Sequence, residues 1–83
     1  MTRTIHDPSE LGEILRQSRK KLGLTQHEAA SLTGVSPRLW SECENGKRVQ
    51  VGFETVLRML HTVGTDLIVE SRRGHGRPVT RNG

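Results

Sequence analysis

Aromatic side chains, cysteine and long apolar runs are nearly absent from this sequence. Trp40 and Phe53 are its two aromatic residues, too few for a platform on which the bases of a single-stranded nucleic acid would stack. A single cysteine, Cys43, excludes an intramolecular disulfide and a cysteine-based zinc site. No apolar run approaches the roughly 18 residues of a membrane span, and no secretion signal is present. We therefore expect a soluble protein of the cytoplasm.

The excess of positive charge is confined to the end of the chain. The formal net charge is +4, but four arginines follow Ser71 without an acidic residue, so residues 1–71 hold nine Lys or Arg and nine Asp or Glu. A surface that binds nucleic acid must therefore be local, and Arg38, Lys47 and Arg48 offer one. The 83 residues make one small domain, which a partner chain would help to stabilise.

Residues 25–34 predict a short helix followed by a turn. Thr25 and Glu28 have the spacing of a capping box, in which each side chain bonds the other residue's amide, so the helix begins at Gln26. Gly34 supplies the turn, because glycine adopts positive φ without a steric penalty. A face of small or apolar residues lets another helix lie close, and it consists of Ala29, Ala30 and Leu32.

A second short helix follows at once. Ser36 before Pro37 is a start signal, and Asn45-Gly46 is a left-handed stop. The residues expected to face inward are Leu39, Trp40 and Cys43. Those left on the outer face are Pro37, Arg38, Ser41 and Glu42. An exposed polar helix of about 1.5 turns, held by a second helix behind it, has dimensions that fit the major groove of DNA.

Helices are also predicted on both sides of this pair. Asp7-Pro8-Ser9-Glu10 is a helix start, and Gly23 ends that helix. Its inward positions are Leu11, Ile14, Leu15, Ser18 and Leu22, and its outer positions are Glu13, Arg16, Gln17, Arg19, Lys20 and Lys21. The three basic residues at its end either complement the helix terminus or contact DNA phosphates. Residues 53–63 form a last amphipathic helix with an inward stripe of Phe53, Val56, Leu57, Leu60 and Val63. Met59 lies off this stripe, where it fills a gap or joins a dimer contact.

Residues 65–71 change to the pattern of a strand. Leu67, Ile68 and Val69 are apolar, flanked by polar residues and too short for a helix after Gly64. An unpaired strand exposes a row of amide and carbonyl groups, so we expect it to pair with the same strand of a second subunit about a two-fold axis. The chain then divides into a flexible arm (1–6), a helical domain (7–64), a dimerising strand (65–71) and a disordered basic tail (72–83).

The order Thr-Gln, two alanines, Gly-Val-Ser and Glu-Asn-Gly-Lys resembles the xenobiotic-response-element (XRE) and Cro/C1 repressor superfamily over roughly residues 11–64. The resemblance implies an all-α fold, a four-helix Cro/C1 repressor-type helix-turn-helix domain that ends in one short β-strand pairing across a dimer. It implies that Gln26 bonds a DNA phosphate and buttresses the second helix of the pair. It also implies a structural role for Glu44, as the partner of a basic residue such as Arg16 or Arg19.

The final strand and the Thr-Val-Leu-Arg-Met-Leu helix make the chain similar to the HipB-type antitoxins. That resemblance implies a homodimer, an autorepressor of its own operator and a partner of a HipA-type serine/threonine kinase toxin. A free-standing XRE-family repressor without a toxin, and a protein-interaction module that binds no DNA, remain as alternatives. An enzyme is disfavoured, because no nucleophile with a base, carboxylate pair or phosphate loop is present. No cofactor or metal is expected.

The expected ligand is double-stranded operator DNA carrying an inverted repeat, which the protein would bind at the nucleoid. Arginine can bond guanine with two donors and glutamate can accept from cytosine N4, whereas basic and amide side chains hold phosphates. The predicted base readers are Ser36, Arg38, Ser41 and Glu42. The predicted phosphate contacts are Gln26, Lys47 and Arg48.

Overall fold

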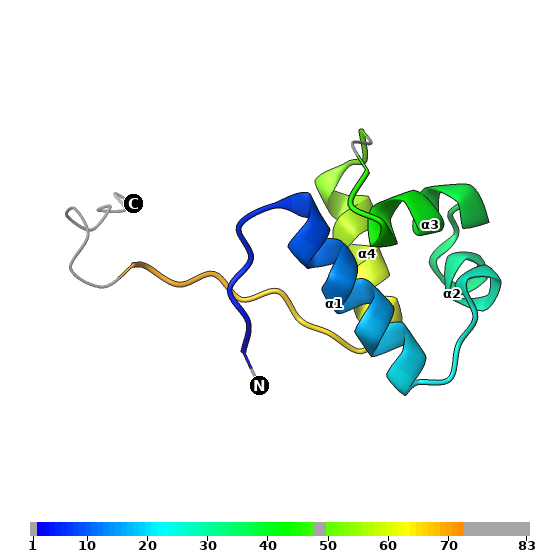
Figure 1. Cartoon of the computed structure of the whole chain (residues 1–83), viewed down its shortest axis with the longest axis horizontal. Coiled ribbons are helices and arrows are strands. Elements are labelled where there is room, and N and C mark those ends of the chain that lie inside the picture. Colours follow the sequence, from blue (N-terminus) through cyan, green and yellow to red (C-terminus); the bar gives the residue numbers. More distant parts are fainter. Residues whose placement is uncertain (1, 48–49, 73–83) are drawn as a thin grey trace.

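The computed structural model describes residues 2–47 and 50–72. Within them the chain forms four helices, α1 (Pro8–Lys21), α2 (Gln26–Thr33), α3 (Pro37–Glu44) and α4 (Phe53–Thr62), as Figure 1 shows. No strand occurs in these two stretches. The predicted four-helix, all-α architecture is therefore confirmed. None of the helices in the described part of the chain is long and apolar enough to span a membrane.

Three of the helices begin at side-chain caps that the sequence predicts. Before α2, the Thr25 hydroxyl accepts a hydrogen bond from the Glu28 amide at 3.0 Å, and the Glu28 carboxylate accepts one from the Thr25 amide at 2.8 Å. Asp7 and Ser36 cap α1 and α3, each accepting from the amide three residues further on at 3.0 Å. These bonds satisfy amides that have no partner within the helix, so the local sequence fixes where each helix begins.

Gly34 makes the turn between α2 and α3. Its φ of 86° lies in the left-handed region, and its amide donates to the carbonyl of Ala30 at 2.9 Å. The amide of Val35 donates to the same carbonyl at 3.0 Å, so the chain reverses within two residues after α2. A side chain at position 34 would strain this backbone, which is why glycine is placed there.

The core lies between the helices and contains one large aromatic side chain. α3 packs on both α1 and α2, and α4 packs on α2. Ala29 and Ala30 are fully buried, so their small side chains let the neighbouring helices approach α2 as predicted. The buried apolar residues are Leu15, Ala29, Ala30, Trp40, Met59, Leu60 and Val63.

Several residues lie on a different side of their helix from the one predicted. Leu22, Leu32 and Phe53 are exposed, whereas Met59 is fully buried. Met59 follows Val56 by three residues, so the two share a helix face, and the core uses that face. Phe53 is the first residue of α4 and stands at the end of the helix. Leu32 faces solvent because the buried side of α2 consists of Ala29, Ala30 and Thr33.

Gly12 marks the closest approach of α1 to α3. A Cβ atom added at this position would lie 2.4 Å from the carbonyl oxygen of Cys43 and 2.5 Å from that of Glu44. No real Cβ atom tolerates such distances, and the obstructing atoms belong to the backbone, which cannot swing aside. Only glycine therefore allows the C-terminal end of α3 to rest on α1.

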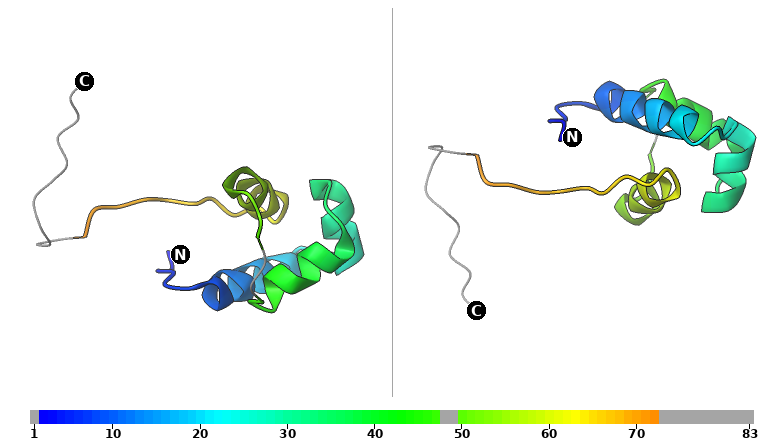
Figure 2. Two further views of the ribbon diagram at one scale, coloured as in Figure 1. Left: turned by 90° about the horizontal axis from the view of Figure 1, so that it is seen from above. Right: turned by 90° about the horizontal axis from the view of Figure 1, so that it is seen from below.

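After α4 the chain leaves the helical body as an extended segment. The views in Figures 1 and 2 agree that residues 65–72 run away from the helices. Leu67, Ile68 and Val69 are 38%, 64% and 89% exposed. Thr65 fixes the start of the segment, because its hydroxyl donates to the hydroxyl of Ser18 in α1 at 3.1 Å.

The predicted strand, N-terminal arm and C-terminal tail compare differently with the structure. Residues 65–71 carry no regular secondary structure in the single chain, so pairing across a dimer stays a prediction. Of the predicted arm, residues 2–6 are described, and they precede α1 without secondary structure. The predicted disordered tail lies outside the described residues apart from Arg72.

Candidate nucleic-acid interface

The outer face of α3 presents a long cationic side chain. Arg38 has 88% of its side chain exposed, and its Nε donates to Oε2 of Glu42 at 3.3 Å, one helical turn further on. The Glu42 side chain is 29% exposed. Ser36 lies at the start of the same helix, where its hydroxyl accepts from an amide, and Ser41 accepts from Asn45 at 3.4 Å. The structure thus brings the four predicted readers together on one short helix.

The inner face of α3 is held by a buried carboxylate. Glu44 accepts two hydrogen bonds from Arg19, from Nε at 2.5 Å and from Nη2 at 2.9 Å. It also accepts from the indole nitrogen of Trp40 at 2.5 Å and from the side-chain amide of Gln26 at 2.9 Å. One side chain therefore joins α1, the start of α2 and α3. The predicted structural role of Glu44 is confirmed, with Arg19 and not Arg16 as its partner.

The charges of this pair are fixed by their surroundings. Burial alone raises the pKa of Glu44, but the hydrogen bonds from Arg19, Gln26 and Trp40 outweigh it and bring the pKa below its ordinary value. The hydrogen bond to Glu44 raises the pKa of Arg19 further. Arg19 was predicted on the outer face of α1, and this is wrong because the buried carboxylate draws the guanidinium inward, where Arg19 is buried.

Gln26 stands at the first position of α2, where amides without a helical partner favour an anion. Its side chain is half-buried and donates to Glu44, so it connects the start of α2 to the end of α3. This is the buttressing role that the family resemblance implies. Its contact with a DNA phosphate stays a prediction.

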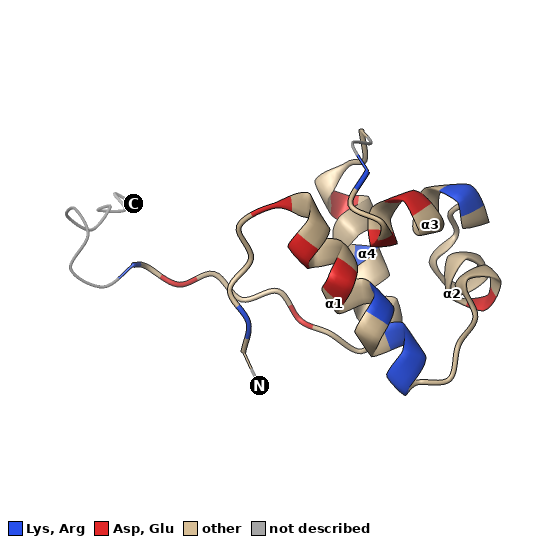
Figure 3. Ribbon diagram, viewed as in Figure 1, with Lys and Arg blue, Asp and Glu red and all other residues tan. Residues whose placement is uncertain are grey.

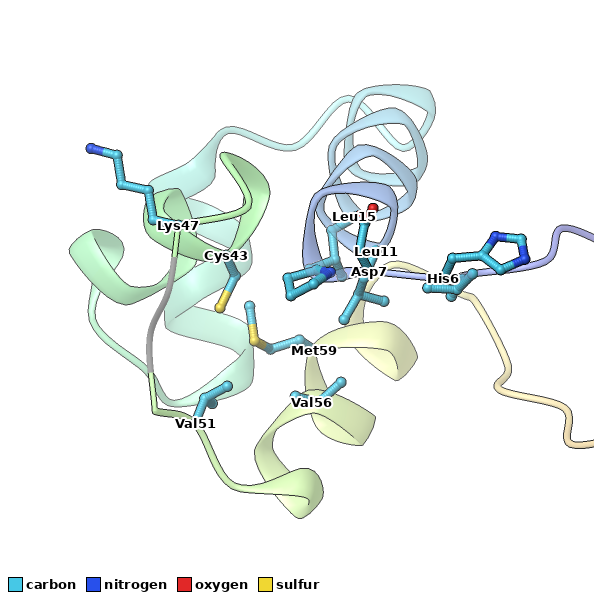
Figure 4. Close-up of a pocket in the computed structure, with 11 residues that line it drawn as sticks. His6, Asp7, Leu11, Leu15, Cys43, Lys47, Val51, Val56 and Met59 are labelled. Atoms are coloured by element: carbon cyan, nitrogen blue, oxygen red, sulfur yellow. The ribbon is translucent and has the colours of Figure 1, made fainter.

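Lys47 follows α3 and is exposed. Its backbone amide donates to the carbonyl of Glu42 at 3.0 Å, which keeps the residue close to the end of the helix. In Figure 4 its ammonium group points away from the neighbouring cavity. This position suits a phosphate contact beside α3. The other predicted contact in this loop, Arg48, lies outside the described residues.

Basic residues also gather on the second half of α1. Figure 3 shows Lys and Arg over that half and Asp and Glu over the first half. Arg16, Lys20 and Lys21 are exposed there. This arrangement complements the helix dipole, and it equally offers cations to a phosphate backbone, so both interpretations stay open. Within the described residues, no group of three or more His, Cys, Asp or Glu side chains is placed to hold a metal ion.

A mostly apolar cavity of about 410 Å³ lies between α1, the end of α3 and α4 (Figure 4), and Lys47 is among the residues that line it. None of the four predicted readers is among its lining residues. Cys43 lines it, and burial, together with the charge of Glu42, raises the pKa of its thiol. The thiol therefore stays protonated and unreactive at neutral pH. Other lining residues include Leu11, Leu15, Val51, Val56 and Met59.

Comparison with known proteins agrees with this architecture. A family model described as a helix-turn-helix domain matches residues 10–72. The chain belongs to this helix-turn-helix family. A curated relative is the uncharacterized HTH-type transcriptional regulator y4mF of Sinorhizobium fredii, which is 35% identical over 68 residues, covering 81% of this chain and 87% of the relative. The predicted XRE-like helix-turn-helix family is thus confirmed.

Two solved structures share the helix-turn-helix fold. The clp gene regulator ClgR from C. glutamicum superposes with a TM-score of 0.68 at 30% identity, over 81% of this chain and 85% of ClgR. The restriction-modification controller protein C.AhdI from Aeromonas hydrophila gives a TM-score of 0.65 at 27% identity, over 72% of this chain and 86% of its own. Both matches span most of this chain and most of the solved protein, so the helix-turn-helix fold is shared over that length.

Some residues that hold the helix-turn-helix unit together were missed by sequence reasoning. Gly12 seats α3 on α1, and the Thr33 hydroxyl bonds both the Ala29 carbonyl at 2.8 Å and the Thr62 hydroxyl at 2.7 Å. A glycine inside an otherwise helical pattern is the signal that could have revealed Gly12, because glycine weakens a helix unless a close contact needs it. Thr33 gave no comparable signal.

Proposed function

We propose that this protein is a sequence-specific, double-stranded DNA-binding repressor without enzymatic activity. The observation that carries the proposal is the two-sidedness of α3. Trp40 and Glu44 lock one side into the body, while Arg38 on the other side is 88% exposed. A rigidly held helix with a free polar edge is what reading of the major groove requires.

In this proposal the outer face of α3 contacts bases, and its surroundings contact phosphates. Arg38 bonds guanine, and Ser36, Ser41 and Glu42 complete the surface that decides which sequence is bound. Lys47, in the loop that follows α3, contacts a phosphate beside the helix. The other proposed phosphate contacts are Gln26 and Arg48. Phosphate contacts set the register of the protein on DNA, and base contacts decide which sequence is bound.

We further propose that two subunits act together on an inverted repeat. The exposed apolar side chains of Leu67, Ile68 and Val69 would be covered when the extended segments of two copies pair as strands. Two copies of α3 then enter major grooves about one helical turn, roughly 34 Å, apart. Bound near its own promoter at the nucleoid of the cytoplasm, the dimer represses by occupying the DNA.

The finer proposal is an antitoxin that also binds a HipA-type serine/threonine kinase toxin. Its support is the similarity of α4 and the following segment to HipB-type proteins. Co-expression with a kinase-like protein encoded by the neighbouring gene tests it. A stable complex of defined stoichiometry is the expected result, and the absence of such a gene contradicts the proposal.

A free-standing regulator without a toxin is the second candidate. It is favoured by the two structural relatives, which are described as a clp gene regulator and a restriction-modification controller. Both candidates share the same DNA-binding mechanism, so the co-expression experiment separates them.

The DNA-binding proposal is tested by fluorescence anisotropy with duplexes. A duplex from the region upstream of the protein's own gene is compared with a scrambled duplex of equal length and composition. We expect tighter binding to the upstream duplex, with affinity that falls steeply as salt rises because phosphate contacts release counterions. If neither duplex is bound even at low salt, the protein is an interaction module and the proposal is wrong.

A further inference from the structure

We infer that Glu42 determines specificity through Arg38, by holding the guanidinium in the orientation that reads guanine, and not by contacting a base of its own. The inference rests on the proposed DNA-binding function and assigns the division of roles within its reading surface. Arg38 is then the base-contacting residue, and Glu42 is a positioning residue.

The contact between the two side chains is the first support. Nε of Arg38 lies 3.3 Å from Oε2 of Glu42, and the residues are four positions apart on one face of α3. Nε is the inner nitrogen of the guanidinium. Because Glu42 takes it, the two terminal nitrogens are left as the edge that faces outward. Two parallel donors are what the O6 and N7 acceptors of guanine require.

The different exposure of the two side chains is the second support. Arg38 is 88% exposed, whereas Glu42 is 29% exposed and so lies closer to the body of the protein. The longer and more exposed side chain therefore reaches furthest from the helix. Glu42 is well placed to act behind it, on the side away from the DNA.

The backbone at Glu42 is also fixed, which a positioning residue needs. Its carbonyl accepts from the amide of Lys47 at 3.0 Å, where the chain leaves α3. Glu42 is followed within two residues by Glu44, which is buried and bonded on several sides. The Glu42 side chain thus starts from a rigid turn, and it restricts Arg38, whose side chain would otherwise lose much conformational freedom on binding.

Electrostatics favours the same division of roles. A carboxylate near DNA is repelled by the phosphates unless a cation neutralises it. Paired with Arg38, Glu42 is neutralised before binding. Once Arg38 is removed, the negative charge of Glu42 becomes uncompensated. The two residues should therefore affect DNA binding as a coupled unit and not as independent contacts.

The test uses the full-length protein and a randomised duplex library. Selection from the library with the unmutated protein defines the preferred DNA motif. Duplexes that carry each single base-pair change in this motif are then titrated with four protein variants: Arg38→Ala, Glu42→Ala, Glu42→Gln and the double alanine variant. We expect Arg38→Ala and Glu42→Ala to lose discrimination, by about tenfold, at the same guanine-containing base pair. Discrimination at that base pair should be equal in the double variant and Arg38→Ala within about twofold, because the second change removes a partner that has nothing left to position. The affinity of the double variant for all duplexes should be higher than that of Arg38→Ala, because the uncompensated carboxylate is gone.

Glu42→Gln is the conservative control. Its amide oxygen can still accept from Nε of Arg38, so it should retain most of the discrimination that Glu42→Ala loses. A merely structural role would show instead as a lower melting temperature, which we expect to be unchanged in all four variants because both side chains lie on the outer face.

Three results would overturn the inference. They are that Glu42→Ala loses discrimination at a second base pair, that it leaves discrimination at every base pair unchanged, or that its effect multiplies with that of Arg38→Ala. The first of these identifies Glu42 as a direct reader of cytosine, with the proposed function intact. If selection with the natural sequence enriches no motif, the proposed function itself is wrong, and the inference falls with it.

Discussion

The guanidinium of Arg19 and the carboxylate of Glu44 form a two-point ion pair inside the protein, with donor–acceptor distances of 2.5 and 2.9 Å. Arg19 belongs to α1, and Glu44 is the last residue of α3. The pair therefore connects the helix that supports the domain with the helix that we propose reads DNA. Removing one partner leaves the other charged and buried, which typically costs about 3–5 kcal/mol.

Acid should weaken the fold through Glu44. Its pKa is below the ordinary value of 4.5 in the folded protein, so its stabilising effect is complete above about pH 4.5 and is lost as the pH falls through the folded-state pKa. Urea unfolding of the natural protein and of Glu44→Gln between pH 3 and 7 measures this. We expect the variant to be less stable at pH 7 and to lose less stability in acid. Glu70→Gln, at an exposed position, is the control. Parallel pH profiles for the natural protein and Glu44→Gln would contradict the prediction.

Gly12→Ala should destabilise the domain. The new methyl group would collide with the backbone carbonyls of Cys43 and Glu44, so α1 and α3 must separate, at a cost of about 1–3 kcal/mol or more. Gly52→Ser is the matched control, because a Cβ there meets nothing within 4 Å and serine is a good helix cap. Thermal unfolding of both variants measures the difference. Equal stability of Gly12→Ala and the natural protein would show that the two helices lie further apart than described.

Features of this fold could be predicted where the residues that determine them are close together in the sequence, and not where they depend on contacts between helices. The capping box of Thr25 and Glu28 needs two residues three positions apart, so the sequence alone located the start of α2. Gly34 and the stop at Gly46 were equally local. The inward position of Arg19 and the burial of Met59 depend on which helix packs against each face. Periodicity within one helix does not contain that information.

The candidate site divides in the same way. The partnership of Glu44 with a basic residue of α1 was implied by the family resemblance. It agrees with the helix dipole, which disfavours a carboxylate at the end of a helix. The contact between Arg38 and Glu42 was not predicted, although their spacing of four residues on a helix permits it. Arg38 was predicted to contact guanine and Glu42 to contact cytosine, because sequence reasoning treated each side chain as free in solvent.

Substitutions at Arg38 and Lys47 should weaken DNA binding in different ways. Arg38→Ala should cost about 1–3 kcal/mol on the preferred duplex and relax one position of the sequence, because a base contact is lost. Lys47→Ala should weaken all duplexes alike and reduce the salt slope by about 1. Titration of each variant against preferred and scrambled duplexes at several salt concentrations separates the two effects. An equal loss on both duplexes for Arg38→Ala would remove it from the readers.

The extended segment should control the oligomeric state. Ile68→Pro removes an amide from the proposed strand pair and restricts its backbone, so we expect a monomer with an intact helical domain. Ile68→Thr keeps a β-branched side chain and serves as the control. Sedimentation equilibrium gives the mass, and circular dichroism reports the helices. A dimer that survives Ile68→Pro would place the contact between subunits elsewhere, and a monomeric natural protein would contradict the strand pairing directly.

The opposed faces of α3 have a consequence for how such a protein changes its target. Trp40 and Glu44 secure the helix from within, and neither belongs to the outward edge that carries Arg38. Mutations along that edge can accumulate without unfolding the domain, so in the DNA-reading role that we propose, new operators become accessible through a few exchanges. Because Arg38 and Glu42 are in contact, those exchanges are expected to occur in pairs, and retargeting by design should vary both positions together.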